Sequence, residues 1–478
     1  MALNAGAMGT VRLPDPENDS ASRGNPDAIG DLAQRAAAWC VRLDQQLQSR
    51  EARTRVLRAY YDGDQPVQFA TRKWRDSFGS TFGQATDNWC RIVIDTATER
   101  MPLIGFSAAT GSEDDGAAAM ALWTRNGLHI DADVAHTDAL VTGQSYILVT
   151  QDEHGAGRIT VEDPLQTIVE HDPADRGRRL AGLKRWRDLD GAWQAQLMTP
   201  DHIWRFTRGA GATTWRAVDE PAANPLGVVP LIPLVNAPDV YGRGHSDLEP
   251  ILPLQDASNK LLGDLLIASE FAAYPQRVLL GVEVPVNPAT GEPDQNLVGG
   301  INRWLAIEDP AAKVQELAAA DLGNYTRSIE LLVQHIAALS RTPPHYLLGQ
   351  MANLSGDALA AAESGLVSRV RRRTTLFGAA WAEAITLAAH IDGAPRLAVS
   401  AVWGNPERIS DVQRADAAVK LAAIGVPQEQ LWAEYGYSPS QISRLKQMQD
   451  RQARLDGVAL GVSDQSGSPP EPPAPPAE

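Results

Sequence analysis

Four side chains that could bind a metal ion lie within the segment HIDADVAHTDAL, residues 129–140. They are Asp131, Asp133, His136 and Asp138. Carboxylates and an imidazole at this spacing can hold a divalent cation, which would give a metal-dependent nuclease a way to activate water. The competing interpretation is structural: the first two aspartates suit a helix N-terminus, and the other two residues would lie on an exposed face. We favour the structural interpretation and predict no metal, no cofactor and no catalytic residue.

A run of arginines in the segment SRVRRR could contact phosphate. On a helix, Arg369, Arg372 and Arg373 share one face, whereas Arg371 points elsewhere. The three residues on the shared face are candidates for pairing with acidic residues of a neighbouring helix or subunit. Contacts with a DNA backbone, which would be blind to base sequence, are the other alternative. The sequence leaves both alternatives open.

The composition narrows the classes of function. The chain has 478 residues, with 43 Lys and Arg against 59 Asp and Glu, and a net charge of −16. This balance argues against a nucleic-acid coat, which is normally basic. It still allows a protein through which DNA passes without being held. The Walker A pattern GxxxxGKS/T is absent, as are GxGxxG, HExxH, GxSxG and CxxC, so we do not expect a motor ATPase.

Two further features bear on the compartment. Cys40 and Cys90 fall within helical patterns far apart in the sequence, which favours buried free thiols over a disulfide. There is no basic-then-apolar leader and no run of 18 apolar residues. We therefore expect a soluble chain that is intracellular where it is made.

Hydrophobic periodicity divides the first half of the chain into helical and β-type regions. Helices are expected over 31–62, within DNWCRIVIDTATERMPLIGF, and near 114–126 and 131–142. Short β-type runs follow at 145–151, 158–164, 166–173, 180–188, 193–208 and 213–220. We expect these runs to form an antiparallel sheet attached to the helices, an α+β fold. The proline-containing segment 224–236 should be its edge strand.

Two long helices then bracket a small Gly/Pro-rich module at 275–318. The first is expected over 251–273, and the second begins with Asp321 as its N-cap. The second helix carries an apolar seam spaced 3, 4, 3, 4, 3, which is a heptad pattern. Its members are Leu322, Tyr325, Ile329, Leu332, Ile336 and Leu339. The two helices should therefore pair, in antiparallel orientation.

Pro343 and Pro344 should end the second helix, because proline fixes φ and removes a backbone donor. An uncharged loop follows, consisting of Gly349, Gln350, Met351, Ala352, Asn353, Leu354, Ser355 and Gly356. A long helix then extends to about residue 389, and a further helical region covers 409–454. The last residues, SDQSGSPPEPPAPPAE, form a disordered tail.

In this order of blocks the chain resembles the portal proteins of tailed bacteriophages, most of all those of phages that infect actinobacteria. The resemblance rests on YYDGDQP, DNWCRIVIDTATERMPLIGF, NPLGVVPLIPLVN, PLQDASNKLLGDLLIASEFAAYPQR and, most specifically, IELLVQHIAALSRTPPHYLLGQ. It runs through nearly the whole chain, and no single motif in it is catalytic.

The resemblance implies a portal-like α+β subunit without enzymatic activity. Its parts would be a flexible N-terminal arm (1–28), a wing of helices and antiparallel sheet (29–245), a first stem helix (246–274), a small α/β clip (275–318), a second stem helix (319–342), a tunnel loop (343–356), a spine helix returning to the wing (357–404), a helical crown (405–460) and a disordered Pro-rich tail (461–478). Such subunits form a ring, usually of twelve, at the unique capsid vertex.

The same resemblance implies the partners. Double-stranded DNA would pass through the ring without sequence recognition, during packaging and again during ejection. The terminase large subunit would dock on the clip, and head–tail connector proteins would later replace it. Major capsid and scaffold proteins are further partners, first in the host cytoplasm and then in the virion, and no membrane is involved. The clip carries no basic cluster, so its docking residues are not assigned.

Two other classes of protein stay as alternatives. One is a metal-dependent nucleic-acid-processing enzyme that uses the cluster at 131–138. The other is a capsid shell or scaffold protein, which would form closed shells or filaments and would not need a module inserted between two long helices.

Overall fold

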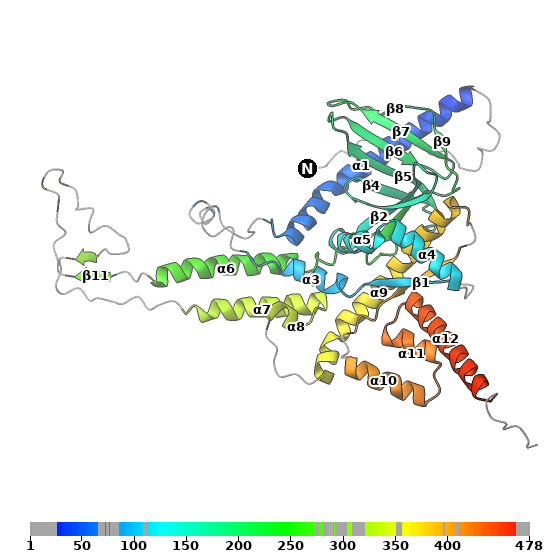
Figure 1. The fold of residues 1–478 in the computed structure, drawn as a ribbon. Coiled ribbons are helices and arrows are strands. Elements are labelled where there is room, and N and C mark those ends of the chain that lie inside the picture. The colour runs from blue at the N-terminus through cyan, green and yellow to red at the C-terminus, as the bar shows by residue number, and fades with distance from the viewer. Residues whose placement is uncertain are drawn as a thin grey trace, which may run out of the picture. The chain divides into compact units, whose positions relative to one another are not determined.

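The computed structural model describes residues 26–65, 86–108, 113–273, 277–280, 304–307, 321–349, 356–394, 397–407 and 411–464, and the single residues 72, 76, 286, 288 and 291. The chain divides into two compact units. The first contains residues up to 51 together with 165–231, and the second contains 52–164 and the residues from 232 onward. Helix α1 (Pro26–Asp62) contributes to both units. Helices and mainly antiparallel sheets are combined, as expected of an α+β fold (Figure 1).

The first unit is an antiparallel sheet packed against one helix. Its strands are β4 (Thr167–His171), β5 (Arg179–Arg187), β6 (Trp193–Met198), β7 (His202–Arg208) and β8 (Arg216–Ala217), in that spatial order, and β9 (Ala222–Ala223) also pairs with β7. Alternate residues of the central strands are apolar, which gives the sheet one apolar face. That face, including Leu183, Leu197 and Phe206, packs against Leu43 and Leu47 of α1.

A buried network of ion pairs fixes α1 on this sheet. Asp44 accepts hydrogen bonds from Arg185 at 2.5 Å, from Arg208 at 2.9 Å and from the indole nitrogen of Trp215 at 3.1 Å. The side chain of Arg185 is 3% exposed and also donates to Glu51. These charges are tolerable in the interior because each has a partner of opposite sign.

The two cysteines are free and buried, as the sequence predicts. Burial raises the pKa of both Cys40 and Cys90 to about 12. Both thiols therefore stay protonated at neutral pH and are poor nucleophiles.

The second unit is built around a long helix, α9 (Gly356–Ile391), with strands and shorter helices packed on it. Its three-stranded sheet has the order β10 (Leu231–Val235), β2 (Gln144–Gln151), β3 (Gly157–Glu162), and β1 (Leu103–Ala108) pairs with β13 (Val399–Trp403). The helices are α3 (Trp89–Thr98), α4 (Glu113–Arg125) and α5 (Leu128–Thr142). Gly157 lets β3 approach α9 closely, because a Cβ there would lie 2.4 Å from the carbonyl oxygen of Ala388.

Aromatic side chains form the centre of the second unit. Trp123 of α4 and Trp381 of α9 meet edge to face, with ring centroids 5.0 Å apart, and Phe106 of β1 meets Trp123 at 5.6 Å. His136 of α5 stacks on Phe377 at 5.2 Å. Edge-to-face and offset contacts of this kind add to the area that the rings bury. They join α4, α5, α9 and β1 into one core.

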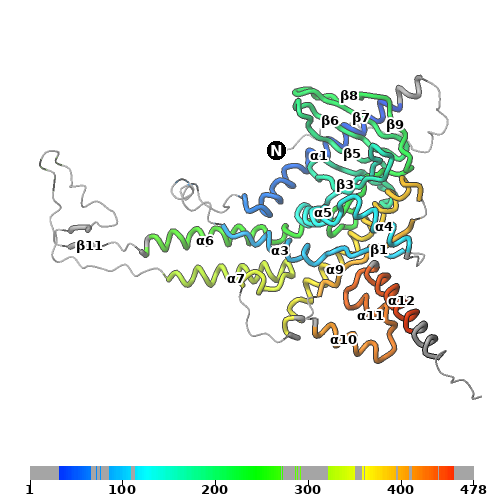
Figure 2. The backbone as a smooth tube through the Cα atoms, viewed as in Figure 1, coloured from blue at the N-terminus to red at the C-terminus, as the bar shows by residue number. Residues whose placement is uncertain are grey.

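Two long helices leave this core side by side. They are α6 (Leu252–Ala273) and α7 (Gly323–Ser340), and a five-residue helix, α8 (Pro344–Leu348), follows α7 (Figures 1 and 2). Between them the structure describes one parallel strand pair, β11 (Arg277–Leu280) with β12 (Trp304–Ile307). The chain ends in α10 (Asp411–Ala423), α11 (Gln428–Tyr435) and α12 (Pro439–Asp464). No helix in the described part of the chain is both long and apolar enough to cross a membrane.

The β-type runs belong to two sheets in different units, which corrects the expectation of one sheet. The first two runs become β2 and β3 in the second unit, and the others become β4 to β8 in the first. The reason is visible in the burial pattern: five consecutive residues of β2 are buried, whereas β6 and β7 bury mainly alternate residues. Helices α5 and α9 contact both β2 and β3, so these two strands pack into the core of the second unit. Segment 224–236 ends in β10, which lies at a sheet edge as predicted, but in the sheet of β2 and β3.

Candidate functional site

The first two turns of α6 are fixed by buried polar side chains. Gln255 accepts a hydrogen bond from the backbone nitrogen of Trp89 at 2.9 Å and donates to the carbonyl oxygen of Asp87 at 2.7 Å. Asn259 accepts from the backbone nitrogen of Asp87 at 3.0 Å, and Asp256 accepts from Tyr60 at 2.7 Å. Apolar periodicity alone does not predict this anchor. The signal was available as the polar run QDASN inside an apolar helical pattern.

The heptad seam of α7 is half-buried along most of its length. Leu322, Tyr325, Ile329 and Leu332 are partly buried, and Ile336 is fully buried. Leu339 is 56% exposed, which corrects its assignment to the seam. Near the end of α7 the buried face is instead Val333, Ile336, Ala337 and Ser340. A straight helix with 3.6 residues per turn drifts away from a heptad pattern, so the contact face rotates along it.

The turn after α7 differs from the expected simple loop. The helix ends at Ser340, and Arg341 adopts a left-handed conformation with φ of 54°. Pro343 precedes α8 and Pro344 is its first residue, a position where proline loses no hydrogen bond. Gly349 ends α8 with φ of 63°. Of the predicted loop, residues 350–355 lie outside the described residues, and Gly356 is the first residue of α9.

A buried cluster joins α8 to the start of α9. Arg100, which lies two residues after the end of α3, contacts both carboxylate oxygens of Glu363 at 3.1 and 3.2 Å. Tyr346 of α8 donates to Glu363 at 2.9 Å, and Arg100 also donates to Tyr346 and to the carbonyl oxygen of Pro406. Burial alone would raise the pKa of Glu363, but the hydrogen bonds from Arg100 and Tyr346 outweigh it and lower that pKa. These contacts fix the two ends of the segment that contains the predicted loop.

Two of the three candidate arginines are internal. Arg373 donates to Asp247 at 2.8 Å, and Arg369 donates to the carbonyl oxygens of Ser340 and Val93 and lies 3.8 Å from Asp247. Both side chains are less than one-tenth exposed. This placement corrects the expectation of phosphate or inter-subunit contacts for Arg369 and Arg373, because neither DNA nor another subunit can reach them here. Their pairing with Asp247 of the same chain explains why two charged side chains are tolerated in the interior.

Arg372 is exposed on α9, and its predicted contact with phosphate or a neighbouring subunit stays a prediction. Arg371 is also exposed and pairs with Glu407 at 2.7 Å. The structure thus separates the face that the sequence assigned to three arginines: residues four apart are buried together, whereas the third points outward.

The aspartate–histidine cluster does not converge. His136 is buried and accepts a hydrogen bond from Trp381 at 2.9 Å, so the expectation that it lies on an exposed face is wrong. Asp138 contacts Arg58 at 2.8 Å, and Asp133 is exposed. Among the described residues, no group of three or more His, Cys, Asp or Glu side chains could hold a metal ion. The nuclease alternative has no support in this arrangement.

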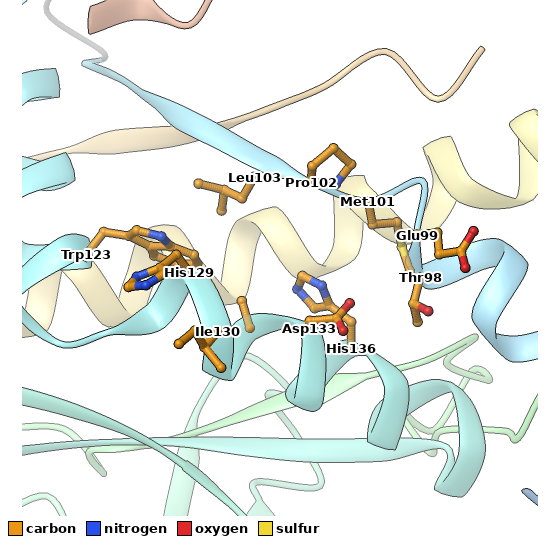
Figure 3. Close-up of a pocket in the computed structure, with 11 residues that line it drawn as sticks. Thr98, Glu99, Met101, Pro102, Leu103, Trp123, His129, Ile130, Asp133 and His136 are labelled. Atoms are coloured by element: carbon orange, nitrogen blue, oxygen red, sulfur yellow. The ribbon is translucent and has the colours of Figure 1, made fainter. Parts of the chain in front are cut away.

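A pocket of about 430 Å³ lies beside this histidine (Figure 3). Residues 101–103 line it on one side, and His129, Asp133 and His136 of α5 line it on another (Figure 3). Burial lowers the pKa of His136 to about 3, so this imidazole is neutral at physiological pH. A neutral histidine surrounded by aromatic rings serves packing and a single hydrogen bond, and it is not poised for proton transfer.

His136 gives a testable pH dependence. Between pH 7 and pH 5, the wild-type chain should lose about 2 kcal/mol of stability relative to the variant His136→Gln. Unfolded His136 binds a proton below its ordinary pKa of 6.5, whereas the folded chain binds one only near pH 3. The stability that neutral His136 contributes is therefore fully present above pH 6.5 and is lost progressively as the pH falls below this value. Asp138, whose pKa burial raises to about 6, acts in the opposite sense but equally in both proteins. Urea unfolding of the wild type and the variant at the two pH values measures the difference in their free energies of unfolding. If this difference is the same at pH 7 and pH 5, His136 is not a buried neutral imidazole.

The family model of phage portal proteins of the SPP1 Gp6-like type matches residues 42–454. The chain therefore belongs to this family of portal proteins, whose members are structural components of the virion.

Named relatives agree with the family. The portal protein of Mycobacterium phage D29 is 31% identical over 400 residues, covering 78% of this chain and 80% of the relative. The portal protein of Mycobacterium phage L5 is 31% identical over 402 residues with the same coverage. These matches confirm the resemblance to portals of phages that infect actinobacteria. The capsid-shell and enzyme alternatives are not supported by them.

Proposed function

We propose that copies of this chain form the ring at the unique vertex of a phage capsid, through which double-stranded DNA is packaged and later ejected. The observation that carries this proposal is the family match over residues 42–454. The paired helices α6 and α7 support it, because they emerge together from the core and bracket residues 274–322, as a stem that carries a clip would. In this assignment α9 is the spine helix, and α10 to α12 form the crown.

The proposed partners follow from this role. Residues 275–318 would receive the terminase large subunit during packaging and the head–tail connector proteins afterwards. Capsid and scaffold proteins would surround the ring, first in the host cytoplasm and then in the virion. We assign no catalytic residue, because the ATP hydrolysis that drives packaging would belong to the terminase. DNA would then pass through the ring and contact it without sequence recognition.

The charge of the chain suits a conduit. Several ionic contacts per subunit, repeated around a ring, would hold DNA through counterion release. A net charge of −16 and an uncharged segment at 349–356 avoid such a hold. We propose that this segment projects into the channel and touches DNA by contact and shape.

Replacement of residues 351–354 by glycine should reduce the DNA content of particles, since the four side chains that would touch DNA are removed. Quantification of packaged DNA in particles with wild-type and variant portals measures the effect. The matched control replaces residues 173–176, which are exposed in the turn between β4 and β5, by glycine. Unchanged DNA content in the loop variant would rule out a role for these side chains in the channel.

Electron microscopy of the purified protein, with native mass determination on the same sample, tests the function as a whole. A closed ring with a channel wide enough for hydrated duplex DNA is expected. Closed shells or filaments would favour a capsid-shell or scaffold protein instead. A monomer or dimer, both alone and after coexpression with the capsid and scaffold proteins of its phage, would contradict the proposal.

A further inference from the structure

The three C-terminal helices have no interior of their own. Among the described residues of α10, α11 and α12, no side chain is buried. Neighbouring helices of this set contact one another, and α12 also contacts β1 and α4 (Figure 1). Large apolar side chains nevertheless remain exposed on both outer helices. Helices of this length are marginal in water unless an apolar face is covered.

On α10 the exposed apolar side chains lie opposite the face that contacts the rest of the chain. The partly buried positions are Arg414, Ala418 and Leu421. The opposite face carries Val412, Asp416, Val419 and Ala423, at spacings of four, three and four residues, and all of them are exposed. Val412 is 79% exposed and Val419 is 69% exposed. We call these four residues the α10 stripe.

On α12 a second stripe also points away from the chain. The partly buried positions lie in its first two turns, on the inner face. They are Pro439, Ile442, Ser443, Leu445 and Lys446. The outer face carries Arg444, Met448, Arg451 and Leu455, again at spacings of four, three and four residues, and all are exposed. Met448 and Leu455 are each 58% exposed. We call these four residues the α12 stripe.

The two stripes match each other in antiparallel orientation and in one register. Val412 then faces Leu455, and Val419 faces Met448, because each pair of residues is seven positions and about 10.5 Å apart along its helix. Between them Asp416 faces Arg451, since each lies four residues from one apolar neighbour and three from the other. At the end, Ala423 leaves room beside Arg444. In parallel orientation the apolar pairs could also align, but Asp416 and Arg451 would then not lie opposite each other.

We propose that the α10 stripe of one copy packs against the α12 stripe of the next copy around the ring. A ring of identical subunits needs two different surfaces that complement each other, whereas a two-fold dimer needs one surface that complements itself. The two stripes differ in composition and lie on different helices. At one matched position they carry opposite charges: Asp416, which also pairs with Lys420 of its own helix at 2.7 Å, faces Arg451. The inference rests on the proposed ring function and adds the surface through which the C-terminal helices of neighbouring subunits would be held.

Engineered cysteines test the register. In the full-length chain Cys40 and Cys90 are buried, so added thiols on the helices are the reactive ones. Oxidation of rings of the double variant Val419→Cys, Met448→Cys should give a ladder of covalent multimers up to the whole ring. The matched control, Val419→Cys with Leu455→Cys, places the thiols about 10 Å out of register and should give no ladder. Each single variant should stay monomeric after denaturation.

The outcomes separate the inference from the function. If the protein forms rings and the in-register pair gives no ladder, the inference is wrong and the portal function stands. If a single Val419→Cys variant gives covalent dimers, the contact is two-fold and the inference is also wrong. If no ring forms in any variant or in the wild type, the proposed function itself fails.

A charge exchange provides an independent readout. The change Asp416→Arg should weaken ring assembly in native mass measurements, and adding Arg451→Asp should restore it. Val419→Asp should likewise reduce assembly, whereas Ile424→Asp should not, because Ile424 is equally exposed, at 77%, but lies off the stripe. Equal effects of the two aspartate substitutions, or a failed restoration, would overturn the proposed pairing.

Discussion

Exchange of Asp247 for asparagine is expected to lower the free energy of unfolding by about 3–5 kcal/mol, because it leaves buried arginines without their counter-charge. Arg373 donates to this carboxylate at 2.8 Å, and Arg369 lies 3.8 Å from it. All three side chains are less than one-tenth exposed. Asn236 also donates to Asp247 at 3.0 Å, so the carboxylate joins α9 to the end of β10 and the segment after it.

The matched control for this exchange is Glu407→Gln. Glu407 pairs with Arg371 of α9 at 2.7 Å, but the two side chains are 40% and 60% exposed. Exposed pairs contribute only about 0–1 kcal/mol, because water solvates both partners when they separate. Urea unfolding of the unassembled subunit compares the two variants with the wild type. Similar small losses for both would show that Asp247 is not a buried counter-charge.

The second large effect is expected for Glu363→Gln, which should cost about 3 kcal/mol of stability. The change keeps the shape of the side chain but removes the charge that compensates Arg100, whose side chain is 4% exposed. Tyr346 then donates to a neutral amide oxygen instead of a carboxylate, so the connection between α8 and α9 becomes weaker. Faster amide hydrogen exchange in residues 344–348 should accompany the loss, because opening of this segment becomes easier.

Tyr346→Phe serves as the graded comparison for Glu363→Gln. It removes the hydroxyl that bonds to both Arg100 and Glu363 but leaves the ion pair intact. The expected cost is about 1.5–3 kcal/mol, the usual range for hydrogen bonds to charged groups. If the phenylalanine variant is the less stable of the two, the tyrosine rather than the ion pair is the main connection between α8 and α9.

Local patterns in the sequence predicted most of the individual elements. Apolar periodicity indicated α6 and α7, alternation indicated strands β4 to β7, and the two prolines after residue 342 marked the end of α7. These signals are local, because about a dozen residues are enough to show which face of a helix or strand is apolar and is therefore buried. The same patterns did not predict α8, since five residues are too few to show a helical period.

The sequence by itself determined the class of protein, because the order of its blocks is that of a portal and the family match confirms it. It also determined that both cysteines are buried free thiols. Only the tertiary structure decided which charges are internal. The sequence places Arg369, Arg372 and Arg373 on one helix face, but burial of the first and third depends on Asp247, more than 120 residues earlier in the chain. His136 was likewise assigned to solvent and is packed on Phe377 and Trp381 instead. A helical period shows which residues share one face of a helix. Whether that face is exposed to water or buried in the core depends on partners distant in the sequence.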